Sequence, residues 1–385
     1  MDGDNLPQPR AARSATLTAV PATPPYAPAT LTSALRLHLL SRHDHRGAGR
    51  AWRALEAALG TPLGPVSWAW TDTWLTHYGD VVKHRFAVAE RDGEVCGVAL
   101  LSTGARSALR PRTLHLGTAG EPRGTGVFVE GNRLVARPAD HAAFAALLAE
   151  AIDADRTWDR LILDGIPPGD AEQVLRRWPQ ARVRVDHCPV TDLTTGDDVL
   201  ASLSSSRRRR LRATLRAFGE LTLEWAADGP QAVAFLDELM DLHQRHWRER
   251  GQPGAFASPR FAAFHRDAVH RMVPEGNAAI VRVRRGEETV GCLYGLIADS
   301  RLLFYQGGLR SYDDNRLRAG QACHVLFMRA CAERGLTAYD FLAPAARYKL
   351  ELATHTTTLA WAEVDRTRWR TRASHGARRV RRAAG

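Results

Sequence analysis

Lysine is nearly absent from this sequence, yet one of its two lysines directly follows a tyrosine. The 53 basic residues include only Lys83 and Lys349, and Lys349 comes after Tyr348, shortly beyond an apolar run that contains Asp340. A compact ammonium can donate three hydrogen bonds to a phosphate, a carboxylate or Asp340, whereas a guanidinium is longer, planar and permanently charged. We therefore expect these three residues to share a polar site. The alternatives are a chance surface lysine and a structural aspartate bonded to main chain.

Four further polar side chains lie where apolar segments end. Tyr305 and Gln306 stand in "LLFYQGGL", and Glu130 and Asn132 stand in "VFVEGN". Polar side chains at the ends of strands are common in binding sites, because the strands hold them rigidly at the edge of a sheet. All four are candidates for contacting a reaction partner. A strand-to-turn transition would also favour Asn132 without any function.

The segment "RLRAGQACHVLFMRACAERG" predicts a helix with an anion site at its start. Arg316 and Arg318 precede Gly320, where the helix is expected to begin. Glycine lets a ligand approach the backbone closely, and the first helical turn offers free N–H groups and a positive dipole end. Arg316, Arg318, Gly320, Gln321 and Ala322 are therefore candidates for holding the phosphates of a coenzyme. Alternatively, Gly320 merely starts a surface helix.

Several familiar catalytic motifs are absent from the sequence. There is no Walker A loop, no GxSxG turn and no HExxH pair. In "HCPVTD", His187 and Asp192 are one residue too far apart for an HxxxD acyltransferase motif. His243 and His246 are three apart on an expected helix, without a nearby Cys or carboxylate to complete a ligand set. We expect no metal site.

The composition is that of a globular chain with an excess of arginine. Of the 385 residues, 44% are hydrophobic and 25% charged, which suits two or three domains with substantial cores. The net charge of +11 favours anionic partners such as a coenzyme or a nucleic acid. An arginine-rich genome would produce the same bias.

The cysteine and hydropathy patterns predict a soluble, cytoplasmic protein. The five cysteines are scattered, and most lie in apolar runs such as "VCGVALL", which indicates reduced core residues. The N-terminal segment lacks a signal-type apolar core. No window approaches the roughly 18 consecutive apolar residues of a membrane span.

The two halves of the chain repeat one pattern of elements. A strand, a Gly-containing turn and a second strand are predicted for residues 86–101 and again for 278–297. A third strand follows each pair, and then a helix and a further strand, in "FAALLAEAIDADRTWDRLILDG" and "HVLFMRACAERGLTAYDFLAP". This match sets Asp159 opposite Asp340. The predicted fold class is α/β with mixed sheets, in two tandem domains of one design.

An arginine-rich helix is expected between the halves. In "SLSSSRRRRLRATLR", Ser204–Ser206 are suitable helix caps, and Arg208, Arg212 and Arg216 would lie along one face. The helix Arg207–Arg216 holds six arginines in ten residues. It suits the phosphates of tRNA or of a coenzyme, and it would also make an ordinary solvated face.

Four segments follow from these patterns. Residues 1–30, rich in Pro, Ala and Thr, are expected to form a disordered arm. Residues 31–195 and 196–365 are the two predicted domains. Residues 366–385 contain eight arginines and form an Arg-rich tail, which is either a solvated charge run or a contact for a polyanion.

Taken in order, these segments resemble two GNAT-type (N-acetyltransferase) folds in tandem. The C-terminal part resembles the CelD/BcsL-like acetyltransferase family, relatives of the Fem-type peptidoglycan aminoacyltransferases. The matching segments are "SWAWTDTWLTHYG", "SLSSSRRRRLRATLR", "HWRERGQPGAFASPRFAAFH", "LLFYQGGLRSYDDNRLRAGQACHVL" and "AYDFLAPAARYKLELA". Together they cover roughly residues 65–362.

The resemblance implies an acyl-CoA co-substrate, acetyl-CoA first among the candidates, with its pyrophosphate held by a Gln/Arg-x-x-Gly-x-Gly/Ala loop. Gly320 and Ala322 fit the last two positions of that loop, whereas Leu317 stands where Gln or Arg is expected. In the Fem-type relatives the donor is aminoacyl-tRNA instead, which the Arg207–Arg216 helix and the tail could contact. Both donors stay open, with acyl-CoA placed first.

The function implied is transfer of an acyl group from acyl-CoA to an amine of a small-molecule or biosynthetic-intermediate acceptor. This reaction needs a base, donors for an oxyanion and an acid for the leaving thiolate. Tyr305 or Tyr348 would protonate the thiolate, and Asp340 would orient or deprotonate the acceptor. Lys349 would supply a point charge beside the coenzyme or the acceptor. The substrate-binding candidates are Glu130, Asn132 and Gln306.

Two other classes of function stay open. The first is an aminoacyl-tRNA-dependent, amide-forming transferase on the same fold. The second is a non-catalytic nucleic-acid-binding protein on a degenerate acyltransferase fold, whose main site would be the arginine helix and the tail.

Overall fold

The computed structural model describes residues 34–104, 110–122, 124–127, 129–193, 198–368 and 371. The arm predicted for residues 1–30 lies outside these ranges, as does most of the predicted tail. The described residues from Leu35 onward belong to one structural unit.

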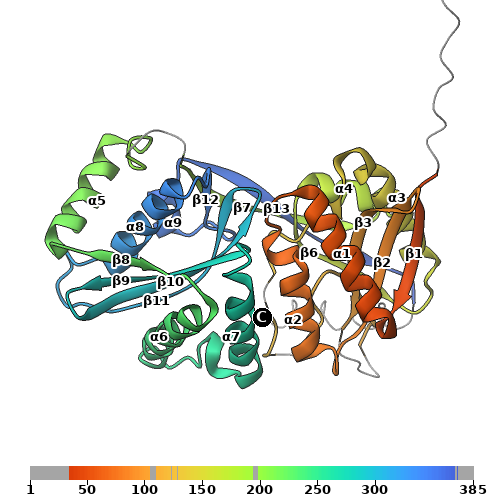
Figure 1. Cartoon of the computed structure of the whole chain (residues 1–385), viewed down its shortest axis with the longest axis horizontal. Helices are drawn as coiled ribbons and strands as arrows, with labels where there is room; N and C mark the ends of the chain where they lie inside the picture. The colour runs from red at the N-terminus through yellow and green to blue at the C-terminus, as the bar shows by residue number, and fades with distance from the viewer. Residues whose placement is uncertain are drawn as a thin grey trace, which may run out of the picture. The chain divides into compact units, whose positions relative to one another are not determined.

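The first half of this unit contains one set of strands and helices (Figure 1). Its strands are β1 (Arg36–Ser41), β2 (Lys83–Arg91), β3 (Glu94–Thr103), β4 (Thr113–Leu116), β5 (Val135–Ala136), β6 (Arg160–Ile166) and β7 (Arg182–Asp192). Its helices are α1 (His45–Leu59), α2 (Trp68–Tyr78), α3 (His141–Ala154) and α4 (Pro168–Leu175).

The second half repeats this order after one extra helix, α5 (Ser205–Phe218). Its strands are β8 (Thr222–Trp225), β9 (Ala278–Arg285), β10 (Glu288–Ala298), β11 (Arg301–Leu309), β12 (Ala338–Asp340) and β13 (His355–Asp365). Its other helices are α6 (Gly229–Arg248), α7 (Pro259–Met272), α8 (Ala319–Glu333) and α9 (Arg347–Leu352). From β1 to β7 and from β8 to β13, strands and helices follow in the same sequence, apart from the short β5. The predicted tandem fold is confirmed.

All but one of the described strands lie in a single path through one mixed sheet. Their order is β1-β2-β3-β4-β6-β13-β7-β12-β11-β10-β9-β8, and β5 pairs with β3 outside this path. In each half three antiparallel strands precede a parallel pair, β4 with β6 and β11 with β12. A parallel pair needs a crossover connection, and the crossovers here contain α3 and α8.

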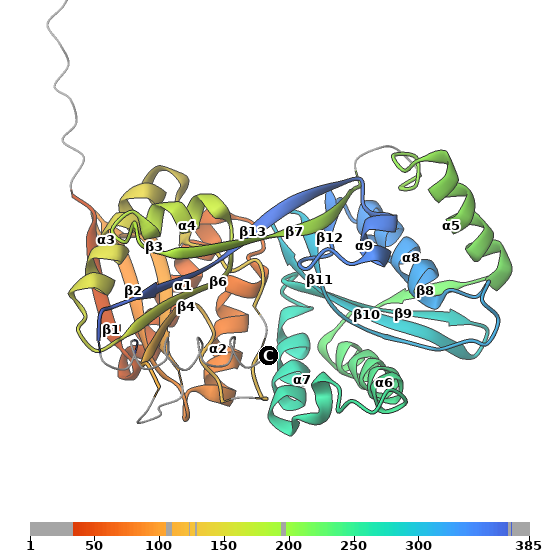
Figure 2. The same cartoon turned by 180° about the vertical axis from the view of Figure 1, so that it is seen from behind.

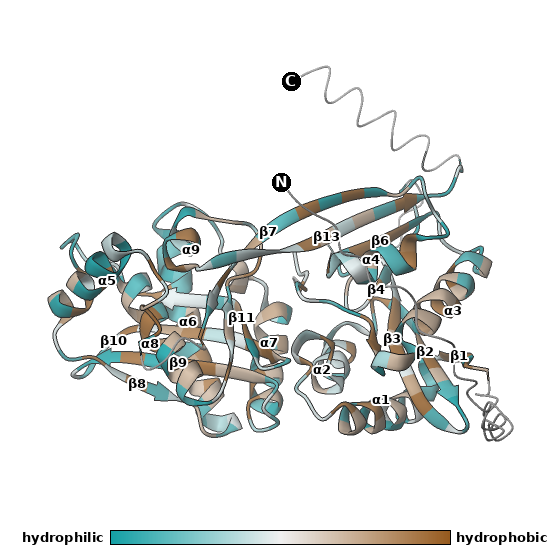
Figure 3. Ribbon diagram, turned by 90° about the horizontal axis from the view of Figure 1, so that it is seen from above, coloured by the Kyte–Doolittle hydropathy of each residue, from teal (hydrophilic) through white to brown (hydrophobic). Residues whose placement is uncertain are grey.

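The last strand of each half completes the sheet of the other half. β13 pairs with β6 through residues 360–365, and β7 pairs with β12 through residues 190–192. Between these ends β7 and β13 pair with each other along 182–190 and 355–363, and Figure 3 shows them running side by side. The two repeats therefore share backbone hydrogen bonds through an exchange of strands.

The predicted hairpins are confirmed, and each has a two-residue turn that contains glycine. Asp92 and Gly93 join β2 to β3 with φ of 54° and 78°. Gly286, with φ of 57°, begins the turn between β9 and β10. Positive φ at these positions matches the twist of paired strands, and glycine adopts it without steric cost.

Three hydrophobic clusters cover the faces of the sheet. One lies beneath α3 and α4, and another beneath α5 and α8. The third joins the two halves through α2 and α7, which lie side by side in Figures 1 and 2. The rings of Trp70 and Phe264 meet edge to face there, with centroids 4.9 Å apart. All five cysteines are buried and free.

The arginine helix α5 packs on α8 with its apolar face. Leu211 and Phe218 are buried, whereas Arg212 and Arg216 are exposed. Ser204 occupies the N-cap position, but its side chain makes no capping hydrogen bond. Among the described residues, no helix has both the length and the apolar character needed to cross a bilayer.

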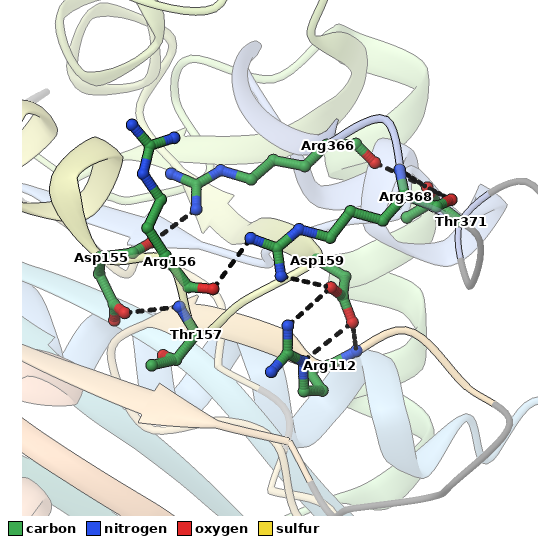
Figure 4. A network of polar contacts seen from close by, with 8 residues as sticks. All are labelled: Arg112, Asp155, Arg156, Thr157, Asp159, Arg366, Arg368 and Thr371. Carbon is green, nitrogen blue, oxygen red and sulfur yellow. Dashed lines mark hydrogen bonds and ion pairs between the residues drawn. The ribbon is translucent and has the colours of Figure 1, made fainter.

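The expected equivalence of Asp159 and Asp340 is wrong. Asp159 precedes β6, whereas Asp340 ends β12, and the two parallel ladders equate Asp340 with Ile162. Figure 4 shows the polar contacts that Asp159 makes. Its carboxylate accepts hydrogen bonds from the main chain and guanidinium of Arg112 and from Arg368. Asp159 therefore anchors the chain after β13 to the first half.

Candidate active site

Strands β11 and β12 pair over only three residues and then separate. Residues 301–303 pair with residues 338–340, where β12 ends, while β11 continues to Leu309. Beyond Leu303 the β11 edge that faced β12 has no strand partner among the described residues. Free main-chain N–H and C=O groups on such an edge can hold an extended ligand by strand-like hydrogen bonds.

A β-bulge places Tyr305 at this opening. Tyr294 of β10 pairs with Gln306, and the next pair is Gly295 with Phe304, so Tyr305 is the extra residue. A bulge bends the strand and redirects the side chain of the extra residue. The predicted site residues Tyr305 and Gln306 therefore occupy the point where the two strands part.

A cavity of about 240 Å³ lies at the opening. It brings together five of the predicted site residues from both halves of the chain. These are Glu130, Tyr305, Gln306, Tyr348 and Lys349. The rest of the lining is Ala255, Phe261, Phe304, Phe341, Leu342 and Ala343.

Lys349 holds the chain segment that follows β12. Its ammonium donates to the carbonyl oxygens of Leu342 at 3.0 Å and of Ala343 at 3.3 Å. The residue is buried, and burial lowers the pKa of Lys349, although the charges of Glu130 and Asp340 oppose this effect. Because an ammonium has three N–H donors, one remains for a ligand in the cavity.

Glu130 reaches the cavity from the first half. Its Oε2 accepts a hydrogen bond of 2.8 Å from the main-chain N–H of Ala343. The N–H of Gly131 donates to the carbonyl of Gly165 at 3.0 Å, which fixes the main chain beside Glu130. Gly165 has a φ of 58°, and a Cβ there would lie 3.0 Å from the Glu130 Cα. Only glycine at 165 lets the two segments approach this closely.

Asp340 faces a neighbouring cavity of about 240 Å³ that shares Leu342 with the first. Its carboxylate accepts from Arg301 and from the N–H of Leu342, each at 2.8 Å. Burial raises the pKa of Asp340, and those two donors counteract the rise. Such contacts are expected of a structural carboxylate, the alternative given above.

Behind Tyr305 lies a buried polar group that the sequence did not reveal. The His265 ring is 4.9 Å from the ring of Tyr305 and 5.8 Å from that of Tyr294. Among the described residues, the two His265 nitrogens and both tyrosine hydroxyls have no hydrogen-bond partner. Burial lowers the pKa of His265 to about 3, so its ring is neutral. His265 occupies a core position of the amphipathic helix α7, where sequence periodicity predicts packing alone.

Tyr348 stands at the rim of the cavity and stacks on a second buried histidine. The rings of Tyr348 and His324 are 6.1 Å apart and inclined by 24°, and Tyr348 is 45% exposed. His324 lies on α8, with its Nδ1 2.9 Å from the hydroxyl of Tyr339. Partial burial raises the pKa of Tyr348, so its hydroxyl stays protonated near neutral pH.

A wider hollow of about 570 Å³ continues from the cavity along β11. It shares Ala255, Gln306 and Tyr348 with the cavity. The rest of its lining is His243, His246, Trp247, Gln252, Pro253, Gly254, Gly307 and Leu309. No His, Cys, Asp or Glu group that could hold a metal ion occurs in the described part of the chain.

The far end of β11 meets the N-terminus of α8. Leu309 lines the hollow, and its Cδ1 lies 3.2 Å from where a Cβ on Gly320 would be. The first helical hydrogen bond runs from the N–H of Ala322 to the carbonyl of Arg318, so the preceding amides have no acceptor within the helix. Arg316 is exposed and pairs with Asp314 at 2.8 Å.

Gln321 links α8 to the helices on either side of it. Its side chain accepts from Thr214 of α5 at 3.3 Å and donates to Glu351 of α9 at 3.1 Å. The predicted phosphate-binding residue is thus engaged within the protein. The main-chain N–H of Gln321 lies in the first turn of α8, where the amides have no acceptor within the helix.

At the corresponding place in the first half, the described residues enclose a much smaller space. The parallel ladders end at His115 in the first half and at Leu303 in the second, and Gly117 and Tyr305 each lie two residues beyond these ends. A Cβ on Gly117 would lie 2.7 Å from the side chain of Asn132. Asn132 donates to the carbonyl of Leu116 at 2.6 Å, and the space remaining is about 20 Å³. The structure therefore places Asn132 away from the cavity, where it fills the position that Tyr305 occupies in the second half.

Part of the sequence matches a known protein family. Residues 205–350 match a family model described as an acetyltransferase (GNAT) domain. The second repeat is a GNAT domain. The matched residues include β11, the start of α8 and both Tyr348 and Lys349. The predicted membership of the GNAT superfamily is confirmed.

Solved structures share the fold of the chain at low sequence identity. The structure of FemX has a TM-score of 0.56 at 14% identity, over 85% of this chain and 96% of FemX. The structure of L-PGS from Bacillus licheniformis has a TM-score of 0.53 at 14% identity, over 85% of this chain and 93% of L-PGS. The relation to Fem-type proteins is thus confirmed for the fold. No curated protein matches the sequence.

Proposed function

We propose that this GNAT protein is an N-acyltransferase that moves an acyl group from acyl-CoA to an amine. The observation that carries the proposal is the convergence of Glu130, Tyr305, Tyr348 and Lys349 on one cavity where β11 and β12 separate. The cavity continues along a free strand edge toward a helix N-terminus. An acyl-CoA fits these three places in turn, with its thioester in the cavity, its extended arm along the strand edge and its phosphates at the helix N-terminus.

The donor would lie along β11 with its phosphates at α8. The strand edge from Phe304 to Leu309 offers main-chain groups to an extended arm. The free amides around Gly320 and the positive dipole end of α8 favour a pyrophosphate, and no acidic residue lies in the first turn of α8. Arg316 and Arg318 stand beside this turn and can add positive charge.

The cavity residues can serve the bond changes of acyl transfer. The amine nitrogen attacks the thioester carbonyl, the C–N bond forms and the C–S bond breaks. Tyr348 can give a proton to the departing thiolate, because its hydroxyl stays protonated near neutral pH. The remaining N–H of Lys349 can hydrogen-bond to the carbonyl oxygen as negative charge develops on it.

A donor panel tests this proposal. Calorimetry with acetyl-CoA, longer acyl-CoAs and free CoA should show binding, and a thiol-release assay with a set of amines should identify turnover. Tyr348→Phe should lower kcat by about 100-fold or more and leave the affinity for acyl-CoA unchanged, because general acid catalysis typically contributes about 100- to 10,000-fold. The proposal fails if the wild-type protein binds no acyl-CoA.

Aminoacyl-tRNA is the second candidate donor. Its support is the exposed arginine face of α5 together with the fold shared with FemX. A phosphate backbone neutralised by these arginines would give affinity that falls steeply with salt. Protection of charged tRNA from hydrolysis by the protein, without heat from any acyl-CoA, would favour this donor.

A further inference from the structure

Glu130 is a partly buried carboxylate without a cationic partner. Among the described residues, no ion pair is found for it, and its one hydrogen bond comes from the N–H of Ala343 to Oε2. Asp340 and Asp159, by contrast, are buried carboxylates that pair with Arg301 and Arg112. A buried charge is costly unless it is paired, so Glu130 is suited to an ion that arrives with a ligand.

The cavity in front of Glu130 has the walls of a cation site. Phe261, Phe304 and Phe341 contribute aromatic rings, and Tyr305 adds a fourth ring. Aromatic rings attract a cation to their faces, and the attraction grows where water is excluded.

Two neighbouring positive charges do not neutralise Glu130. Lys349 of the second half donates to the carbonyls of Leu342 and Ala343 and forms no ion pair with Glu130. Arg184 of β7 pairs with Asp186 and lies over the ring of Trp361. Both influence Glu130 only at longer range, so the carboxylate keeps room for a ligand cation.

We propose that Glu130 binds the protonated amine of the acceptor, and that the acceptors are therefore aliphatic ammonium compounds instead of neutral aryl amines or alcohols. This inference rests on the proposed function, in which the cavity is the place of reaction. It gives the first repeat a definite role, because the first repeat supplies the carboxylate that selects the substrate bound in the cavity. The ammonium would lie between Glu130 Oε1 and the ring of Tyr305.

The same contact can begin the reaction. An ammonium must lose one proton before its nitrogen can attack, and Glu130 is placed to receive it. Burial raises the pKa of Glu130, while the Ala343 N–H and the charges of Lys349 and Arg184 oppose the rise and Asp340 adds to it. A higher pKa makes the carboxylate a better proton acceptor near neutral pH. When the amide forms, the nitrogen loses a second proton to solvent. The thiolate takes its proton from Tyr348, which regains one from solvent, so one of the two protons ends on the thiol and the other in solvent.

The test separates amine binding from donor binding. Cyclohexylammonium and its neutral analogue cyclohexanol are titrated into the full-length protein without a donor, and binding is followed by calorimetry. Glu130→Gln keeps an oxygen for the Ala343 N–H but removes the charge. We expect the wild-type protein to prefer the ammonium, and Glu130→Gln to lose at least tenfold of that affinity while binding acyl-CoA as before.

Glu121→Gln is the matched control. Glu121 lies on the same segment of the first half, and its carboxylate already accepts from the Trp74 indole and the N–H of Val127. Its replacement should leave ammonium affinity unchanged. Equal affinity of wild type and Glu130→Gln for cyclohexylammonium, or no preference over cyclohexanol, would overturn the inference. Normal ammonium binding without any acyl-CoA binding would instead overturn the proposed function.

Discussion

The ammonium of Lys349 lies 3.0 Å from the carbonyl oxygen of Leu342, a residue that has a φ of 57°. The same ammonium bonds Ala343, whose N–H in turn bonds Glu130. The side chain of Lys349 is thus the link that holds the segment after β12 against the carboxylate from the first half. Nearly all other basic residues of the chain are arginine, but this buried position requires the narrow alkyl chain and compact ammonium of lysine.

Lys349→Arg should damage this link even though the charge is kept. A planar guanidinium is too large for a buried position fitted to an ammonium, and overpacking typically costs about 1–3 kcal/mol. Lys349→Met should leave two carbonyl groups without their donor, at a similar cost of about 1–3 kcal/mol. Both variants should lose activity. Urea unfolding and turnover with the best donor measure the two effects.

Lys83→Arg is the control for this pair, because Lys83 is exposed at the start of β2. It should match the wild type in both assays. A Lys349→Arg variant that behaves like Lys83→Arg would show that the buried lysine has no special role.

Gly320→Asp should weaken donor binding without harming the fold. A Cβ at this position meets only the flexible end of the Leu309 side chain, at 3.2 Å. A carboxylate in the first turn of a helix is favourable for the helix itself, so the Tm should not fall. The same carboxylate would repel a pyrophosphate at close range, and we expect at least a tenfold loss of acyl-CoA affinity.

Gly320→Asn is the uncharged counterpart of this change and should retain most of the affinity. Calorimetry on the three proteins decides the matter. If the aspartate and asparagine variants bind acyl-CoA equally, the phosphates do not lie at the start of α8.

Gly165→Ala should displace the main chain at Glu130. The new Cβ would lie 2.8 Å from the Val129 carbonyl oxygen and 3.0 Å from the Glu130 Cα, at a φ of 58°. Gly286→Ala imposes the same backbone strain, with a φ of 57°, but its Cβ meets nothing within 4 Å. We expect about 1 kcal/mol of destabilisation for Gly286→Ala and roughly 1–3 kcal/mol more for Gly165→Ala.

Turnover distinguishes these two variants further. Gly165→Ala should raise the KM for the amine, because Glu130 must move, while Gly286→Ala should leave it unchanged. Equal kinetic constants for the two variants would mean that the Gly165 contact does not position Glu130.

Much of the fold was predictable because local signals and the repeat agreed. The hairpin turns at Gly93 and Gly286 and the helix start near Gly320 follow from residue spacing. The exchange of β7 and β13 was not predictable, since each strand is a plain alternating segment whose partner is set by tertiary packing. Pairing in register depends on contacts between residues that are 146 to 150 positions apart for β7 with β12 and 194 to 205 positions apart for β13 with β6, which periodicity does not encode.

The site was predictable only in part, for a related reason. Tyr305, Tyr348 and Lys349 stood out as polar residues in apolar surroundings, and the structure brings them together. His265 and His324 gave no signal, because a histidine on the apolar face of a helix looks like an ordinary core residue. The matching of Asp159 with Asp340 failed because it rested on similar residue types. In the strand pairing, the residue of β6 that corresponds to Asp340 is Ile162, three positions after Asp159.

Asp159 should make the stability of the protein depend on pH. Burial alone would raise the pKa of Asp159, but the hydrogen bonds from Arg112 and the charges of Arg112 and Arg368 outweigh it and lower the pKa to about 2. A carboxylate with a lowered folded-state pKa stabilises the fold above its unfolded value, near 3.9, and loses this contribution as pH falls toward 2. The side chain is 1% exposed, so about 2 kcal/mol is at stake.

Urea unfolding at pH 7 and at pH 2.5 can isolate this contribution. Between these values, the free energy of unfolding of Asp159→Asn should fall by about 2 kcal/mol less than that of the wild type, because the variant has no proton to bind at this position. Asp314→Asn removes a carboxylate whose partner Arg316 is 81% exposed. The free energy of unfolding of Asp314→Asn should depend on pH nearly as that of the wild type does, since solvent screens surface ion pairs. Identical pH dependence of Asp159→Asn and the wild type would show that the Arg112–Asp159–Arg368 contacts do not stabilise the fold.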